Sequence, residues 1–310
     1  MTVCESPAFR AGTPARPSCQ SCRDARSPPS PVLLSAERHL DALLSRAGPK
    51  SGRENGLLVL GICGAQGSGK STLASALAAR LAARAIPCAI LSLDDLYRTR
   101  AERQAMARQV HPLFATRGVP GTHDVDLGLA TIAALRRGES VALPRFDKAR
   151  DDRAPPGQWP VMRARVLIFE GWCLGLEPQS EEALTEPVNA LERNEDPHDI
   201  WRKAVNAALA GPYRALWATL DSLIFLAAPD FETVRIWRRE QEEQLRARMA
   251  CGASPRGAES AAGPMPGLMD QTALARFMAH YERLTRHALA TLPARADLTL
   301  PLDRQRNLTG

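Results

Sequence analysis

A run of glycine, lysine and serine residues in the first quarter of the chain has the types and the spacing needed to bind phosphate. It matches the pattern G-x-x-x-x-G-K-[ST] and consists of Gly64, Ala65, Gln66, Gly67, Ser68, Gly69, Lys70 and Ser71. In such a loop the backbone N–H groups bind phosphate oxygens, the lysine reaches the β- and γ-phosphates, and the serine hydroxyl binds Mg²⁺. We therefore expect residues 64–72, including Thr72, to bind ATP, with Lys70 as a catalytic residue and Ser71 as a magnesium ligand.

The segments on either side of this loop are the ones that phosphate binding requires. Residues 57–63 are short and apolar and predict a buried strand, whereas residues 72–84 are rich in alanine and leucine and predict a helix. The glycines between them permit positive φ angles and a close approach of the backbone to a ligand. This context favours a phosphate-binding loop over a chance glycine-rich turn.

Acidic residues follow two further apolar segments. Asp94 and Asp95 come directly after residues 88–93, and Glu170 lies near the end of residues 165–172. A strand, a helix and a strand at this spacing predict a parallel sheet, and ligands bind at the carboxyl ends of its strands. An acid that ends an apolar strand is the Walker B pattern, so we expect Glu170 to help place Mg²⁺. The adjacent aspartates are either functional or a solvated turn, and the nearby phosphate loop favours a function for at least one of them.

Two long loops carry further polar side chains. Residues 111–124 are rich in glycine and proline and contain Arg117, His123 and Asp124. A loop of defined shape with these side chains, at the edge of a sheet, is a candidate substrate loop, although a single histidine is often structural. Residues 144–153 have mixed charges and are either a cluster of surface ion pairs or the lining of a polar site.

The 310 residues are enough for one large α/β domain. Residues 1–30 have almost no large apolar side chains, which predicts a disordered tail. Residues 31–54 predict a short helix, capped at Ser35, and a linker into the main domain at residues 55–310. Further helices are expected at 201–217 (interrupted at Gly211–Pro212), 232–250 and 273–292, further strands at 221–228 and 296–302, a polar insertion at 176–200, and a flexible loop at 252–267.

Composition limits the partners of the chain. The net charge is +6, but the arginines are scattered, so we expect no nucleic-acid partner. No apolar run approaches the ~18 residues of a membrane span, so we expect no membrane partner. The chain has 7 cysteines. An odd number, with Cys63 and Cys88 in predicted buried strands, argues for a reducing compartment and a cytoplasmic protein. Cys19 and Cys22 have metal-like spacing, but no second pair follows, so zinc is not expected. The oligomeric state stays open.

Several motifs, taken in order, resemble those of the plant and fungal type of glycerate kinase, which is related to phosphoribulokinase, uridine kinase and pantothenate kinase. After the phosphate loop they read S-L-D-D-L-Y, G-V-P-G-T-H-D, L-P-R-F-D-K-A-R-D-D-R, F-E-G-W-C-L-G and V-R-I-W-R-R-E-Q-E-E-Q-L. The resemblance covers residues 55–305, and Leu96 departs from it because the relatives commonly have phenylalanine there. It implies a P-loop NTPase fold, in which a mostly parallel sheet is flanked by helices and a helical lid lies around residues 230–270.

The resemblance also implies a reaction and roles for single residues. ATP and D-glycerate would give ADP and 3-phospho-D-glycerate, with Mg²⁺ as cofactor. Asp94 corresponds to the base that takes the proton of the acceptor hydroxyl, and we also expect it to be a magnesium ligand with Ser71 and Glu170. The lid would supply a catalytic guanidinium from Arg235 or Arg239, since Ile236 and Trp237 are expected to pack inward. The expected substrate contacts are Tyr97, Arg117, His123, Asp124, Lys148 and Arg153.

The acceptor itself rests on charge and on this resemblance. Glycerate needs cations for its carboxylate, and Arg117, His123, Lys148 and Arg153 would supply them, with Asp124 holding a hydroxyl. Aromatic residues are only 5% of the chain, which weakens a nucleoside acceptor, although Tyr97, Phe114 and Phe146 leave it open. The alternatives are a uridine- or pantothenate-type kinase, or a nucleotide-dependent switch, against which the absence of an N-K-x-D tetrad argues. The 3-phosphate as product follows from the resemblance.

Overall fold

The computed structural model describes residues 29–46, 56–250 and 269–309. Nearly all of the predicted tail, the linker before the first strand and the predicted flexible loop at 252–267 lie outside the described residues, as do Cys4, Cys19, Cys22 and Cys251. The described helices and strands belong to one compact unit, Pro31–Gly310. None of the described helices is both long enough and apolar enough to cross a membrane.

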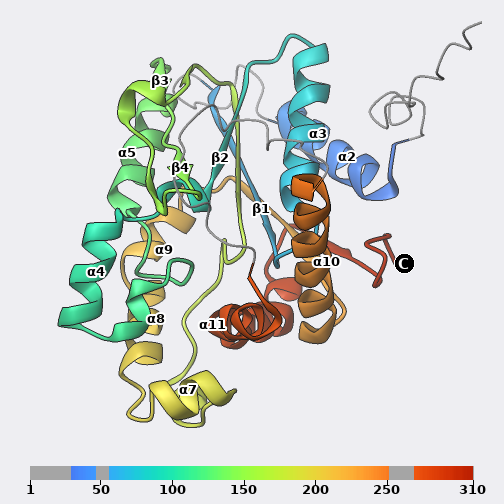
Figure 1. Ribbon diagram of the computed structural model, residues 1–310. Helices are drawn as coiled ribbons and strands as arrows, with labels where there is room; N and C mark the ends of the chain where they lie inside the picture. Colours follow the sequence, from blue (N-terminus) through green and yellow to red (C-terminus); the bar gives the residue numbers. More distant parts are fainter. Residues whose placement is uncertain (1–28, 47–55, 251–268, 310) are drawn as a thin grey trace, which may run out of the picture. The chain divides into compact units, whose positions relative to one another are not determined.

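A five-stranded parallel sheet forms the centre of this unit (Figure 1). Every neighbouring pair of its strands is parallel, which confirms the predicted fold class. In spatial order the strands are β2 (Cys88–Ser92), β7 (Val166–Gly171), β1 (Leu58–Gly64), β8 (Ser222–Ala227) and β9 (Leu298–Pro301). Because β1 is the middle strand, the phosphate loop that follows it leaves from the centre of the sheet.

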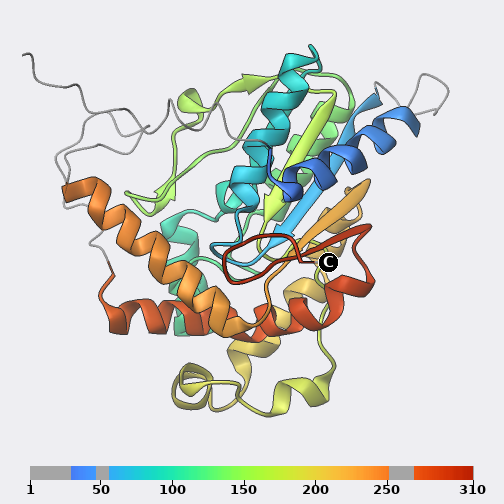
Figure 2. The ribbon, with the colours of Figure 1, turned by 90° about the vertical axis from the view of Figure 1, so that its right-hand side faces the viewer.

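Helices cover both faces of the sheet (Figures 1 and 2). The predicted helix at 201–217 is divided at Gly211–Pro212, as expected, because proline has no N–H group with which to continue the helical hydrogen bonds. The predicted polar insertion at 176–200 holds two short helices whose Leu184 and Leu191 are buried. The helices are α2 (Pro31–Arg46), α3 (Lys70–Ala83), α4 (Arg100–Gln109), α5 (Val125–Arg136), α6 (Glu181–Thr185), α7 (Ala190–Glu195), α8 (Ile200–Ala210), α9 (Pro212–Trp217), α10 (Phe231–Ala250) and α11 (Gln271–Thr291).

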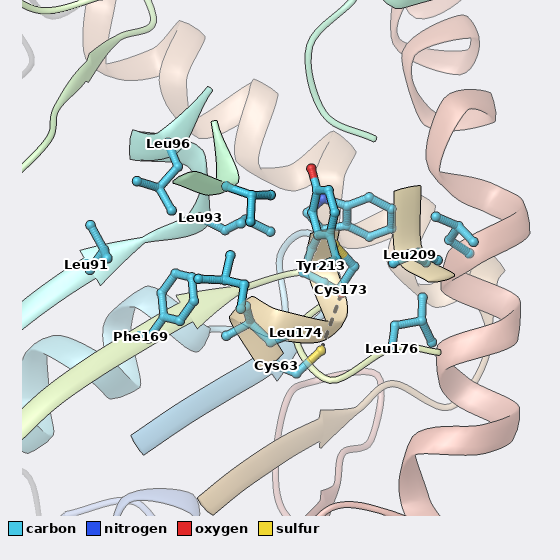
Figure 3. Close-up of a cluster of buried hydrophobic side chains, with 14 of the residues drawn as sticks. Cys63, Leu91, Leu93, Leu96, Phe169, Cys173, Leu174, Leu176, Leu209 and Tyr213 are labelled. Atoms are coloured by element: carbon cyan, nitrogen blue, oxygen red, sulfur yellow. Dashed lines mark hydrogen bonds between the residues drawn. The ribbon is translucent and has the colours of Figure 1, made fainter. Parts of the chain in front are cut away.

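Successive side chains of the strands point to opposite faces of the sheet, and each face is covered by its own hydrophobic cluster. Leu60 and Ile62 of β1 pack with α2, α3 and α10, whereas Val59 and Cys63 pack with α5, α8 and α9 on the other face. Helix α11 contributes to both clusters. A strand that is buried on both faces is apolar throughout rather than alternating, which is why residues 57–63 read as a continuous apolar run. Figure 3 shows part of the second cluster, with Cys63, Leu91 and Phe169 among the labelled side chains.

Short elements at the carboxyl edge of the sheet carry the candidate site. A 3-10 helix, Leu93–Leu96, follows β2 and begins where Ser92 Oγ accepts a hydrogen bond from the N–H of Asp94. Two-residue strands β4 (Phe146–Asp147) and β5 (Asp152–Arg153) form a hairpin that makes up most of the predicted loop at 144–153. The other short elements are β3 (Val141–Ala142), β6 (Val161–Met162) and the 3-10 helices Pro112–Ala115, Pro156–Gln158 and Leu292–Ala294.

Candidate active site

The phosphate loop has the geometry that its sequence predicts. It joins the end of β1 to α3, which begins at Lys70. Gly67 and Gly69 have φ angles of 80° and 90°, a left-handed conformation that residues with a side chain rarely adopt. At Gly67 there is a second requirement, because a Cβ atom there would lie 2.5 Å from the Cβ of Trp237. The backbone of the loop therefore packs directly against α10.

Ser71 and Glu170 lie together, as a magnesium site requires. The Oγ of Ser71 donates a hydrogen bond to Oε1 of Glu170 at 3.0 Å. Glu170 is buried, and its Oε2 has no hydrogen-bond partner among the residues that the structure describes. A buried carboxylate oxygen without a partner is costly, and a hard cation would satisfy it. The site therefore fits Mg²⁺. The described part of the chain has no group of three or more His, Cys, Asp or Glu residues that could hold a metal ion without other ligands.

Two further buried polar atoms in the loop have no partner in the described part of the chain, Oε1 of Gln66 and Oγ of Ser68. They lie within the residues expected to hold ATP. The hydroxyl of Ser68 can donate a hydrogen bond to a phosphate oxygen, whereas Oε1 of Gln66 can only accept one. The Ser68 hydroxyl and the backbone N–H groups of the loop therefore fit the phosphates of a nucleotide.

Asp94 lies within the electrostatic reach of Lys70 and contacts two other side chains of the site. Its Oδ2 accepts a hydrogen bond from Nζ of Lys148 at 2.7 Å, and its Oδ1 accepts one from the hydroxyl of Tyr97 at 2.8 Å. Burial would raise the pKa of the Asp94 carboxyl, but the charges of Lys148 and Lys70 outweigh this effect. The hydrogen bonds from Lys148 and Tyr97 lower it further, so the pKa is well below its usual range. Asp94 is therefore an ionised carboxylate beside the P-loop lysine.

The neighbouring Asp95 holds the β4–β5 hairpin in place. Its carboxylate accepts hydrogen bonds from Nη1 of Arg145 at 3.3 Å and from the backbone N–H of Phe146 at 3.1 Å. Burial raises the pKa of Asp95 above its ordinary value, although Arg145 opposes the shift. Asp95 therefore fixes the start of the β4–β5 hairpin, the hairpin that brings Lys148 to Asp94.

The two predicted loops meet at Tyr97. A β-bridge pairs Tyr97 with His123, and their rings stack with centroids 4.6 Å apart. From the hairpin, Nη2 of Arg153 donates to the carbonyl of Tyr97 at 3.2 Å and to Oδ2 of Asp124 at 2.9 Å. Oδ1 of Asp124 also accepts from the N–H of Leu127 and caps α5. The structure therefore brings together these substrate candidates, but it already uses both oxygens of Asp124 in protein contacts.

His123 is buried and is held by Tyr213. The backbone N–H of Gly121 donates to the hydroxyl of Tyr213 at 3.0 Å, and that hydroxyl lies 2.6 Å from Nδ1 of His123. Nε2 of His123 is buried and has no hydrogen-bond partner in the described part of the chain. Burial lowers the pKa of His123 to about 3, so the expectation that His123 adds a positive charge is wrong, and the ring is neutral.

Arg117 is held from the hairpin. Its guanidinium pairs with the carboxylate of Asp151 and lies 5.5 Å from the ring centroid of Phe146. Asp151 also pairs with the buried Arg103 at 2.9 Å, and its φ of 53° is a strained conformation for a residue other than glycine. The mixed charges of residues 144–153 therefore form ion pairs, as the first of the two interpretations predicts, and those of Lys148 and Arg153 lie at the candidate site. That the loop lines a polar substrate site stays a prediction.

Helix α10 contacts the phosphate loop through Trp237. Trp237 is fully buried, as predicted, but Ile236 is 41% exposed, so the expectation that it packs inward is wrong. Adjacent helical residues point about 100° apart, and both cannot face the same neighbour. Arg235 and Arg239 are exposed. Arg235 pairs with Glu232, while Arg238 pairs with Glu242 at 3.1 Å and lies over the ring of Phe277.

Three residues at the site were not found from the sequence. Nε of Arg306 donates to the carbonyl of Gly67 at 2.6 Å, and its guanidinium lies 5.0 Å from the ring centroid of Trp237. Tyr213 holds His123, and the hydroxyl of Tyr281 donates to the carbonyl of Arg117 at 3.3 Å. No local pattern marks these residues, since each reaches the site from a distant segment.

Comparisons with known proteins agree with this geometry. Residues 59–178 match the phosphoribulokinase/uridine kinase family. An uncharacterized kinase of Schizosaccharomyces pombe, mug58, is 35% identical over 234 residues, which cover 72% of this chain and 83% of that protein. The chloroplastic D-glycerate 3-kinase of Arabidopsis thaliana is 32% identical over 210 residues, which cover 64% of this chain but only 43% of that protein.

A solved structure shows the same fold. It is that of D-glycerate 3-kinase from Cryptococcus neoformans, with a TM-score of 0.73, 22% identity, and coverage of 91% of this chain and 99% of that one. The match extends across the sheet and its helices, well beyond the residues that match the family. From the phosphate loop, the parallel sheet and these relatives, we conclude that the chain is a P-loop kinase and belongs to the phosphoribulokinase/uridine kinase family.

Proposed function

We propose that this kinase transfers the γ-phosphoryl group of ATP to D-glycerate, giving ADP and 3-phospho-D-glycerate. The observation that carries the proposal is the pairing of Asp94 with Lys148 close to Lys70. A small hydroxy acid needs a base for its hydroxyl and a cation for its carboxylate, and this pair offers both. The 32% identity to the D-glycerate 3-kinase of Arabidopsis supports the same acceptor.

The proposed steps follow from the position of each group. Lys148 exchanges its contact with Asp94 for the carboxylate of glycerate, which leaves the Asp94 carboxylate free to accept the proton of the 3-hydroxyl. The hydroxyl oxygen then bonds to the γ-phosphorus as the bond between that phosphorus and the β,γ-bridging oxygen breaks, while Lys70 stabilises the charge on the phosphates. Ser71 and Glu170 would hold Mg²⁺, which would supply neutralisation of the phosphate charge.

The charged groups around Asp94 suit an acidic acceptor. The side chain of Lys148 is 62% exposed, and those of Arg117 and Arg153 are 28% and 20% exposed. These cations lie on the two loops that meet at Tyr97, next to the base. Guanidinium groups bind carboxylates with two parallel hydrogen bonds, so Arg117 and Arg153 can assist Lys148.

The aromatic rings near the site favour glycerate over a nucleoside. Tyr97, Phe114 and Phe146 were the rings that left a nucleoside acceptor open, and they are only 3%, 2% and 8% exposed. Tyr97 stacks on His123 and meets the ring of Phe146 edge-on. A nucleoside base binds by stacking on an open aromatic face. Since these faces are covered by protein, the site offers no such platform among these three rings.

A panel of acceptors tests the proposal. Release of ADP from Mg-ATP is measured with D-glycerate, uridine and pantothenate, and with no acceptor; we expect release with D-glycerate alone. Enolase free of phosphoglycerate mutase then distinguishes the product isomers, because it acts directly on 2-phosphoglycerate. Immediate formation of phosphoenolpyruvate would refute transfer to the 3-hydroxyl, and release of ADP with uridine or pantothenate but not D-glycerate would refute the acceptor.

A further inference from the structure

Two aromatic side chains meet at one point of the acceptor loop, which we define as residues 111–124. Trp172 follows β7 directly, and its Nε1 donates a hydrogen bond to the carbonyl of Gly118 at 2.9 Å. Tyr281, from α11, donates its hydroxyl proton to the carbonyl of Arg117 at 3.3 Å. The two rings contact each other edge to face, with centroids 4.9 Å apart. Consecutive carbonyls of the loop are therefore held by two side chains that are 109 residues apart in the chain.

Gly118 makes this contact possible. Its φ of 138° is a conformation that residues with side chains rarely adopt, and a Cβ atom there would lie 1.9 Å from the Tyr281 hydroxyl. No side chain fits between the loop and α11, so the loop backbone lies directly against the tyrosine. The loop is also closed on itself, since the N–H of Gly118 donates to Oγ1 of Thr122 at 3.0 Å. The contact is thus a close approach of backbone to side chain and not a loose surface contact.

The held segment leads directly to the reacting groups. Arg117 carries one of the cations of the site, and the carbonyl that Tyr281 holds is its own. Burial raises the pKa of the Tyr281 hydroxyl, and the nearby Asp94 carboxylate raises it further. Asp94 also lies one hydrogen bond from Tyr97, which pairs with His123 of the loop. A shift of the loop at residues 117–118 would therefore move both the Arg117 side chain and the wall of the site.

We propose that Tyr281 and Trp172 are positioning residues that clamp the acceptor loop at Gly118 and thereby set the affinity for the acceptor. They act through Arg117 and the loop backbone and do not take part in the transfer itself. The choice of D-glycerate as acceptor rests on the proposed function, whereas the clamp on the loop does not. A loss of the clamp should weaken acceptor binding and leave the nucleotide site, on the phosphate loop, unchanged.

Two conservative substitutions test the clamp. Tyr281→Phe removes the hydroxyl and keeps the ring, and Trp172→Phe removes the donor to Gly118. A matched control is Thr285→Val, one turn further along α11, at a buried hydroxyl without a partner in the described part of the chain. Hydrogen exchange of the amides in residues 112–124 is measured for each protein, together with kcat and with KM for both substrates.

We expect faster exchange in residues 112–124 for both test variants and not for the control. KM for D-glycerate should rise about threefold to tenfold in each, the range for one hydrogen bond, while KM for ATP stays unchanged. Unchanged exchange in the loop, an unchanged KM for D-glycerate, or an equal rise in both KM values would overturn the clamp. If the wild-type protein releases no ADP with D-glycerate, the proposed function fails, and the exchange measurement alone decides the clamp.

Discussion

Replacing Lys148 by methionine separates the binding of the acceptor from the stability of the fold. Lys148 donates to Asp94 at 2.7 Å, yet its side chain is 62% exposed. Methionine keeps the length and the apolar stem of lysine and removes the charge. Ion pairs with a solvent-exposed partner contribute only about 0.2–1 kcal/mol, so the free energy of unfolding should fall by less than about 1 kcal/mol.

The effect on the acceptor should be much larger. A hydrogen bond to a charged group contributes about 1.5–3 kcal/mol, and loss of such a bond between Lys148 and the carboxylate of glycerate corresponds to about a 10- to 150-fold rise in KM. The KM for ATP should stay within about twofold, because the phosphate loop is untouched. Lys203→Met is a matched control: Lys203 is an exposed lysine on α8 that pairs with Asp199 at 3.0 Å and is not among the residues of the site.

Lys148→Met should also shift the pH dependence of activity and of stability. The charge of Lys148 helps to lower the pKa of Asp94, so its removal raises that pKa. The pH at which activity is lost on the acid side should therefore move upward. The ion pair between Lys148 and Asp94 stabilises the fold above the unfolded pKa of aspartate, about 4, and below that of lysine, about 10. Because Asp94 becomes protonated as the pH falls from about 4 towards its lower pKa in the folded protein, the stability difference between variant and wild type should vanish there.

Steady-state kinetics between about pH 4 and pH 9, with urea unfolding of the same proteins, measure all of these effects. A Lys148→Met variant whose KM for D-glycerate matches the wild-type value would refute the placement of this lysine at the acceptor carboxylate. A fall in stability of several kcal/mol would show instead that the residue is structural.

Three other predictions concern the reacting groups and the lid. Lys70→Ala should remove most turnover at saturating ATP with an unchanged circular dichroism spectrum; near-native turnover would argue against the phosphate loop. Asp94→Asn should lower kcat by about 10²–10⁴-fold with little change in KM for ATP, whereas Asp95→Asn, which loosens the hairpin, should mainly lower the thermal midpoint; a larger loss of kcat in Asp95→Asn would reverse the assignment. Alanine at Arg235 or Arg239, which are exposed, should slow phosphoryl transfer without lowering the thermal midpoint. Arg238→Ala should lower the thermal midpoint, because Glu242 loses its ion-pair partner. Normal transfer in all three variants would end the assignment of a catalytic arginine to α10.

The sheet and the phosphate loop could be predicted because their signals are local. Buried parallel strands are apolar along their whole length, and the spacing of Gly64, Lys70 and Ser71 is fixed by the way a backbone surrounds phosphate. The placement of Asp94 within electrostatic reach of Lys70 followed from topology, because β1 and β2 are parallel strands of one sheet, separated only by β7, and their carboxyl ends share one edge.

Other features depend on tertiary packing, which local patterns do not encode. The prediction that His123 carries a positive charge was wrong because burial, and not the residue type, decides its protonation. Tyr213, Tyr281 and Arg306 reach the site from 90, 164 and 239 residues away from their hydrogen-bond partners. A tyrosine or an arginine has no sequence signal that tells which distant carbonyl or ring it will contact.

The most direct test of the proposed reaction is the ³¹P NMR spectrum of the products that form from Mg-ATP and D-glycerate. The proposed chemistry predicts 3-phospho-D-glycerate in amounts equal to ADP with the wild-type protein, and about 100-fold less of both products, or lower still, in the same time with Asp94→Asn. Release of ADP without any phosphorylated glycerate, or equal amounts of 3-phospho-D-glycerate from the Asp94→Asn variant, would contradict it.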